Sequence, residues 1–91
     1  MRAKHYPNIS QMRELHKKIL AAVTALSNEN IEVMRIDCMQ GETPVIEVYN
    51  CPRNRKLYGV PCGTGTDHHG PFVRKDARVM GCKVTWAEEK V

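Results

Sequence analysis

One stretch, residues 31–51, constrains the fold most, because two runs of alternating apolar and polar residues flank a single glycine, Gly41. A period of two residues is the pattern of a β-strand with one buried face. The sequence therefore predicts strands over 31–38 and 44–51, joined as a hairpin across Gly41.

The register of this hairpin follows from the pairing that leaves one face apolar, since a shift by one residue exchanges the two faces. A three-residue loop over 40–42 places Ile36 opposite Ile46 on the apolar face and Arg35 opposite Glu47 on the other. That second face also carries Ile31, Val33, Tyr49 and Cys51. A single helix covers one face of a sheet, so we expect a loop or a binding partner to cover the second.

Residues 9–26, ahead of the hairpin, have the periodicity of an amphipathic helix, with Asn8 or Ser10 in position to cap its start. After the hairpin the sequence predicts a turn over 52–55, a short strand over 56–60, a long loop over 61–71, a turn over 74–77, a strand over 78–86 and a tail over 87–91. Long loops are often functional, so the loop over 61–71 is a candidate site.

These elements predict a single α+β domain over 1–91, with one N-terminal amphipathic helix packed on a three- or four-stranded antiparallel sheet. A meander is expected, because consecutive strands usually pair. The predicted core comprises Ile9, Met12, Leu15, Ile19, Val23, Met34, Ile36, Ile46, Val48, Met80, Cys82, Val84 and Trp86.

No apolar run approaches the roughly 20 residues that cross a bilayer, and the first residues lack the apolar region of a signal peptide. We therefore expect a cytoplasmic protein without a membrane partner. The four cysteines are expected to be reduced in that compartment, so their even number does not predict disulfides.

Several cysteine and histidine residues could form a metal site or a catalytic site. Zinc sites usually draw on closely spaced ligand pairs, and no Cys-x-x-Cys occurs, although Cys51, Cys62, His68 and His69 could supply four ligands. Cys62 with His68 could also form a nucleophile and its base, but no orienting residue accompanies them. We predict no metal, no cofactor and no catalysis.

The charge distribution points to an acidic partner. The net charge is +4, and the basic residues gather in 1–30 and 52–78, on either side of an acidic hairpin. The predicted partner-binding residues are Tyr49, Arg53, Arg55, Lys56, Tyr58, Arg74, Lys75 and Arg78. Basic groups beside aromatic rings suit a small nucleic-acid-binding module, and they equally suit a charged sheet edge that prevents strand pairing.

The basic amphipathic helix, the cysteine-containing strands and the ending Gly81-Cys-Lys-Val-Thr-Trp86 resemble the short accessory proteins of temperate phages and prophages. Such proteins often occupy a host or phage macromolecule, and anti-defence proteins such as anti-CRISPR inhibitors are among them. The resemblance implies a non-catalytic protein that blocks a host macromolecular complex by protein–protein contact. The alternative is the basic nucleic-acid-binding module.

Overall fold

The computed structural model describes residues 9–38 and 43–89. They form an α-helix, α1 (Ile9–Asn28), then β1 (Val33–Asp37), β2 (Val45–Val48), a 3₁₀-helix, η1 (Pro52–Leu57), β3 (Val60–Asp67), β4 (Gly70–Val79) and β5 (Cys82–Glu89). The α+β class and the N-terminal helix agree with the sequence prediction.

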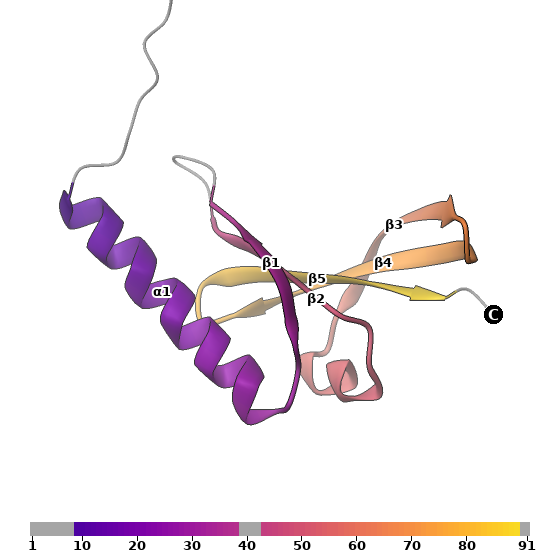
Figure 1. Ribbon diagram of the computed structural model, residues 1–91, viewed down its shortest axis with the longest axis horizontal. Coiled ribbons are helices and arrows are strands. Elements are labelled where there is room, and N and C mark those ends of the chain that lie inside the picture. Colours follow the sequence, from indigo (N-terminus) through magenta and orange to yellow (C-terminus); the bar gives the residue numbers. More distant parts are fainter. Residues whose placement is uncertain (1–8, 39–42, 90–91) are drawn as a thin grey trace, which may run out of the picture.

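The sheet is mixed, in contrast to the predicted antiparallel meander of three or four strands. Its five described strands lie in the order β1-β2-β5-β4-β3 (Figure 1). β5 pairs parallel to β2, and the other neighbours are antiparallel. The prediction failed because the chain leaves β2 through η1 and the β3–β4 hairpin before β5 returns beside β2, and parallel neighbours need such a long crossover.

The β1–β2 register was predicted correctly for Arg35 opposite Glu47 and for Ile36 opposite Ile46. A bulge between Val33 and Arg35 then shifts the pairing by one residue and sets Val33 opposite Val48 rather than Tyr49. Because a one-residue shift exchanges the faces, Val33 turns toward the core.

The predicted second apolar face is therefore wrong. Ile31 is buried in the same core as Val48, and Val33 and Cys51 pack against that core, while Tyr49 is exposed. On the opposite face of the sheet lie charged pairs, with Arg35 Nε 3.0 Å from Glu47 Oε2 and Lys83 Nζ 3.5 Å from an Asp76 carboxylate oxygen. That face needs no apolar cover.

The segment predicted as a loop over 61–71 is part of the β3–β4 hairpin, and the predicted turn over 74–77 lies inside β4. Prolines stand only at the second residue of each strand, near the strand ends where they are tolerated. The ring of Phe72 lies over Gly65, so close that a Cβ on that glycine would be 2.5 Å from Phe72 Cζ. Cross-strand packing thus compensates for a glycine-rich strand.

Two further sequence predictions are corrected by neighbouring turns. Within the short strand expected over 56–60, only Val60 is in a strand, as the start of β3; the preceding residues end η1 and turn, because Tyr58 adopts a left-handed conformation (φ 53°). Met80 and Gly81 also have positive φ and form the two-residue turn between β4 and β5, which leaves Met80 exposed. β5 continues to Glu89, so residues 87–89 are strand rather than tail.

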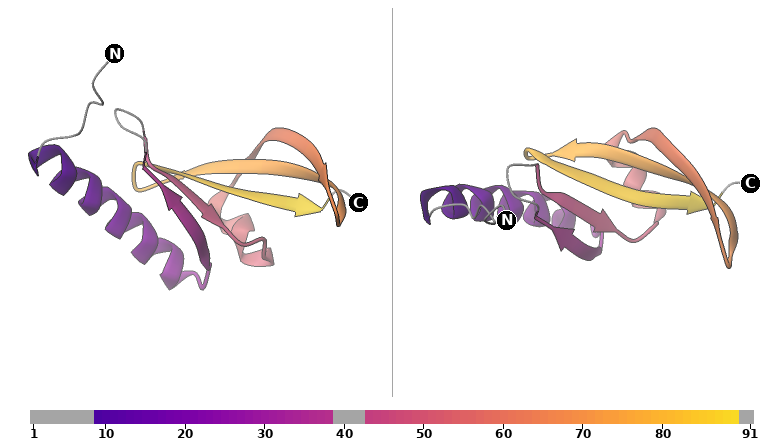
Figure 2. Two further views of the ribbon diagram at one scale, coloured as in Figure 1. Left: turned by 45° about the horizontal axis from the view of Figure 1, so that its top comes forward. Right: turned by 90° about the horizontal axis from the view of Figure 1, so that it is seen from above.

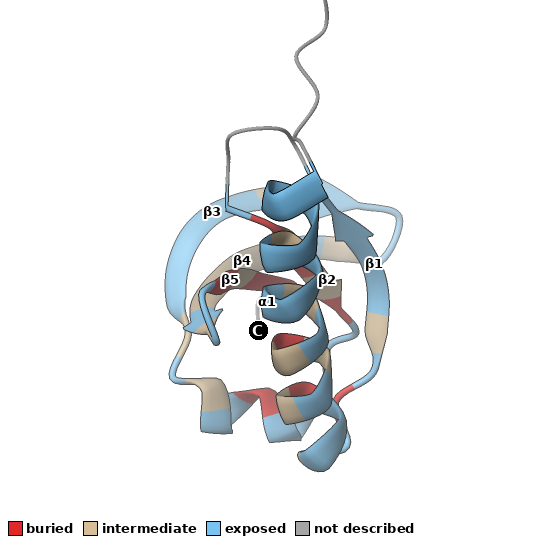
Figure 3. Ribbon diagram, turned by 90° about the vertical axis from the view of Figure 1, so that its left-hand side faces the viewer, coloured by how far each residue is buried: buried red, intermediate tan, exposed pale blue. Residues whose placement is uncertain are grey.

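The core lies where the C-terminal half of α1 and η1 cover one face of β2 and β5 (Figure 3). The buried apolar residues are Ala22, Leu26, Ile31, Ile46, Val48, Cys82, Val84 and Trp86. Five of these were predicted. Others predicted as core are exposed, namely Ile9, Met12, Met34, Ile36 and Met80.

These exposed residues follow from the placement of α1 and β1. The first turns of α1 project past the sheet, and β1 is an edge strand, so no other described element lies over either of them (Figure 2). The radius of gyration is 14.8 Å, whereas a compact domain of this length has about 12 Å. The shortest dimension is 19 Å, so the molecule is thin and its surface is large relative to the size of its core.

Candidate functional site

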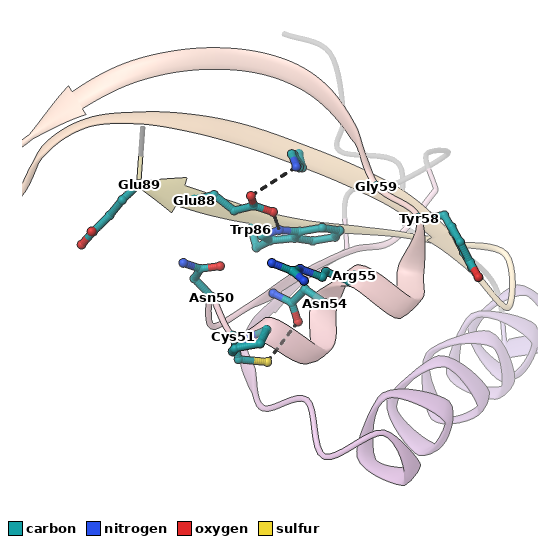
Figure 4. A pocket seen from close by; sticks show the side chains of 11 residues that line it. Asn50, Cys51, Asn54, Arg55, Tyr58, Gly59, Trp86, Glu88 and Glu89 are labelled. Atoms are coloured by element: carbon teal, nitrogen blue, oxygen red, sulfur yellow. Dashed lines mark hydrogen bonds and ion pairs between the residues drawn. The ribbon is translucent and has the colours of Figure 1, made fainter. Parts of the chain in front are cut away.

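A cavity of about 600 Å³ opens between η1 and the β4–β5 hairpin (Figure 4). Trp86 and Gly59 supply its apolar wall, and the main polar groups are Asn50, Asn54, Arg55, Lys75 and Glu88. A pocket with one aromatic wall and a few convergent polar groups is a typical binding site.

The conformation of η1 follows from the residues at its two ends. Cys51 is extended (φ −153°, ψ 159°), and Pro52 occupies the first turn, where its missing N–H costs nothing. At the other end, Tyr58 donates its backbone N–H to the carbonyl of Arg55 at 3.1 Å. The left-handed Tyr58 reverses the chain, and this reversal brings Gly59 against the ring of Trp86.

Asn54 anchors η1 to the end of β2. Its side chain is 1% exposed, its Nδ2 donates to the carbonyl of Tyr49 at 3.1 Å, and its Oδ1 accepts the thiol of Cys51 at 3.3 Å. A buried amide with both ends satisfied fixes a loop in one conformation. The floor of the cavity is therefore rigidly positioned.

Glu88 joins the indole and the ammonium group at the opposite wall. Trp86 Nε1 donates to Glu88 Oε2 at 2.8 Å, and Lys75 Nζ lies 3.2 Å from Glu88 Oε1. The hydrogen bond from Trp86 is the main cause that lowers the pKa of Glu88, with further contributions from Lys75 and from the charge of Arg55. The carboxylate is thus ionised at neutral pH and is a weak base.

The lining combines amides, charged side chains and one thiol. It holds no histidine among the described residues, and its one thiol, on Cys51, donates to an amide oxygen rather than to a base. Nucleophilic catalysis requires such a base within hydrogen-bonding distance. What the site offers a ligand is the guanidinium of Arg55, a carboxylate held by two donors and the amide of Asn50.

Three of the predicted partner-binding residues meet at this cavity, Arg55, Tyr58 and Lys75. Tyr58 is 88% exposed, and with Arg78 it lines a second hollow of about 350 Å³. Tyr49 lies just past the end of β2 and is exposed, and its carbonyl accepts the Asn54 amide. The fold thus gathers the aromatic residue Tyr58 with three of the predicted cations.

Most of the predicted cations already have partners within the fold. Lys56 Nζ lies 2.8 Å from Glu29 Oε2, and Arg53 donates to the carbonyl of Asn30 at 3.4 Å, so both connect η1 to the end of α1. Arg74 donates to the hydroxyl of Thr85 at 3.4 Å, and Lys75 pairs with Glu88. Of the six, only Arg55 and Arg78 lack a hydrogen-bond or ion-pair partner among the described residues.

The four residues considered for zinc do not form a cluster. Cys51 precedes η1, Cys62 lies on β3, and His68 and His69 form the β3–β4 turn with their ring centroids 4.0 Å apart. The described part of the chain contains no group of three or more His, Cys, Asp and Glu side chains that could hold a metal ion.

Neither described helix has the length and apolar character needed to cross a membrane.

A second candidate surface is apolar and lies between α1 and β1. A Cβ on Gly81 would be 3.7 Å from Lys18 Cδ, so that flank of α1 faces the β4–β5 turn. At 100° per residue the opposite flank, which carries Met12 and Leu20, turns toward β1. We call the exposed apolar set, from 43% to 71% exposed, the α1–β1 surface: Ile9, Met12, Leu20, Met34 and Ile36.

Comparison with protein-family models, with curated proteins and with solved structures found no match for this chain.

The sequence analysis did not identify Asn54 and Glu88 as members of a site. The alternation of Val84 and Trp86 continues to Glu88, and a strand extended by two residues would have placed Glu88 on the Trp86 face. No comparable sequence signal marks Asn54, because its burial depends on tertiary contacts.

Proposed function

We propose that this protein is a non-catalytic binding protein that acts by protein–protein contact. The observation that carries the proposal is the α1–β1 surface, where five large apolar side chains are exposed, whereas eight apolar residues of the described ranges form the core. Large exposed apolar patches are typical of interaction sites. The resemblance to short phage accessory proteins suggests a host or phage complex as the target, which binding would block.

The alternative, a nucleic-acid-binding module, is supported by Tyr58, Arg55 and Arg78 at adjoining hollows. Its strength can be estimated from the free cations. Two phosphate contacts give a slope of about −2 in a plot of log K against log salt, whereas strong binders making 6–10 contacts have slopes of roughly −5 to −9. Four of the six predicted cations are engaged within the fold, so this basic group would bind nucleic acid only weakly. We therefore prefer protein binding as the function.

The test uses reciprocal variants. Leu20→Glu places a charge on the α1–β1 surface at a position 69% exposed, so the fold should tolerate it. Tyr58→Asn removes the exposed ring, and asparagine tolerates the left-handed backbone of this position. Proteins captured from a candidate host would be identified, purified and titrated against wild type and both variants by calorimetry, with circular dichroism as the control for folding.

We expect a captured protein to bind wild type and Tyr58→Asn equally and to bind Leu20→Glu at least about tenfold more weakly. Loss of binding in Tyr58→Asn alone would transfer the site to the basic residues and the ring. Saturable binding of DNA or RNA with a salt slope steeper than about −4 would overturn the proposal in favour of the nucleic-acid module.

A further inference from the structure

The sheet has two edges among the described strands, and β3 is the longer, with eight residues against five in β1. The two-residue turns at both ends of β4 fix the direction of its backbone groups. Gly63 and Gly65 direct their N–H and C=O groups toward β4, so those of Thr64 and Thr66 point outward. Among the described residues, no strand pairs with this outer edge of β3.

The two edges differ in how they are protected against strand pairing. β1 carries Arg35, Asp37 and a bulge, which are the usual means of preventing association. β3 carries no charge from Val60 to Thr66, and its bulge lies at its start, between Pro61 and Gly63. The outward groups of Thr64 and Thr66 are therefore open to another strand.

Self-pairing fits this edge. In an antiparallel arrangement with Thr64 on a two-fold axis, Thr64 faces its own counterpart, a favourable cross-strand pair. Asp67 then approaches Pro61 of the second copy. Next to that position lie Tyr58 and Arg78, which share a hollow with Val60, so an acidic end meets an end with a free cation. A strand of another protein that carries charges along its length would find no opposite charges on β3 between Val60 and Thr66.

We propose that β3 pairs antiparallel with β3 of a second copy of this chain and joins the two five-stranded sheets into one. This inference goes beyond the proposed function and does not depend on it. Because β3 and α1 lie at opposite ends of the molecule, the dimer leaves both α1–β1 surfaces free (Figure 1). Two identical surfaces would then act bivalently on a repetitive target.

The proposal can be tested without a partner. Thr64→Lys sets two ammonium groups opposite each other at the axis, which disfavours pairing. Thr24→Lys is the matched control, since Thr24 is also exposed but lies on α1. By sedimentation equilibrium we expect wild type and Thr24→Lys to form dimers, and Thr64→Lys to raise the dissociation constant at least about tenfold.

Amide hydrogen exchange supplies an independent readout. In the monomer the amides of Thr64 and Thr66 face solvent and exchange fast, whereas those of Gly63 and Gly65 are bonded to β4. We expect protection of Thr64 and Thr66 to increase with protein concentration, with Gly63 and Gly65 protected throughout. The proposal is overturned if wild type remains monomeric at about 1 mM, if folded Thr64→Lys dimerises like wild type, or if Thr64 exchanges fast in the dimer.

Discussion

Replacing Gly59 by alanine should destabilise the fold, because Gly59 packs directly against the ring of Trp86. A Cβ built on Gly59 would collide with Cη2 of the indole, would lie 2.7 Å from Cζ2 and would be 3.3 Å from the backbone oxygen of Asp76. Carbon atoms in contact are normally about 3.5–4.0 Å apart. The ring cannot easily withdraw, since it is 2% exposed and its Nε1 is bonded to Glu88 at 2.8 Å.

Overpacking of this kind costs about 1–3 kcal/mol. For a domain of this size each kcal/mol lowers Tm by about 4–8 °C, so a cost near 2 kcal/mol predicts a decrease of ~8–16 °C. Urea unfolding followed by circular dichroism should give a lower midpoint with an unchanged slope, as expected for a native-state effect. The fluorescence of Trp86, the only tryptophan, should report the displaced ring.

Gly63→Ala is the matched control. A Cβ at Gly63 has no heavy atom within 4 Å, and its φ is not positive, so the same chemical change meets open space. At such a position the substitution is expected to be neutral or to stabilise by about 0.4–1 kcal/mol through the unfolded chain. Equal unfolding midpoints for the two variants would refute the close contact between Gly59 and Trp86.

Three other predictions follow from the cavity and the thiols. Asn54→Ala should cost about 1–3 kcal/mol by urea unfolding, because it removes both hydrogen bonds of a buried side chain; a loss no larger than that of exposed Asn50→Ala would contradict this. The lowered pKa of Glu88 adds stability above the unfolded value of 4.5 that is lost on acidification, so Glu88→Gln should lose less stability between pH 7 and pH 3 than wild type does. Burial raises the pKa of Cys82, so a thiol reagent should label exposed Cys62 first and Cys82 only on unfolding.

The parts of the fold that the sequence predicted are those set by local periodicity. The helix over 9–26 and the buried alternation of Cys82, Val84 and Trp86 need only the repeat of apolar residues along one element. The Arg35–Glu47 pair likewise follows from the two strands of one hairpin. Short-range patterns carry this information because the side chains concerned are neighbours in sequence.

The β3–β4 hairpin could not be predicted in this way. Its strands contain Gly63, Gly65 and Pro71, which lower the propensity to form a strand. Cross-strand contacts compensate for this: Phe72 lies over Gly65, and Lys75 and Asp76 of β4 pair with Glu88 and Lys83 of β5. The candidate cavity was missed for the same reason, since it forms only when η1 is placed over β5.

The fold also explains why part of the basic segment 52–78 is neutralised by ion pairs. The β4–β5 hairpin sets Lys75 beside Glu88, and η1 folds back so that Lys56 meets Glu29 after the helix. Pairs of this kind cancel the long-range field that would steer an acidic partner. A binding surface on this protein is therefore better sought among its unpaired apolar side chains than among its cations.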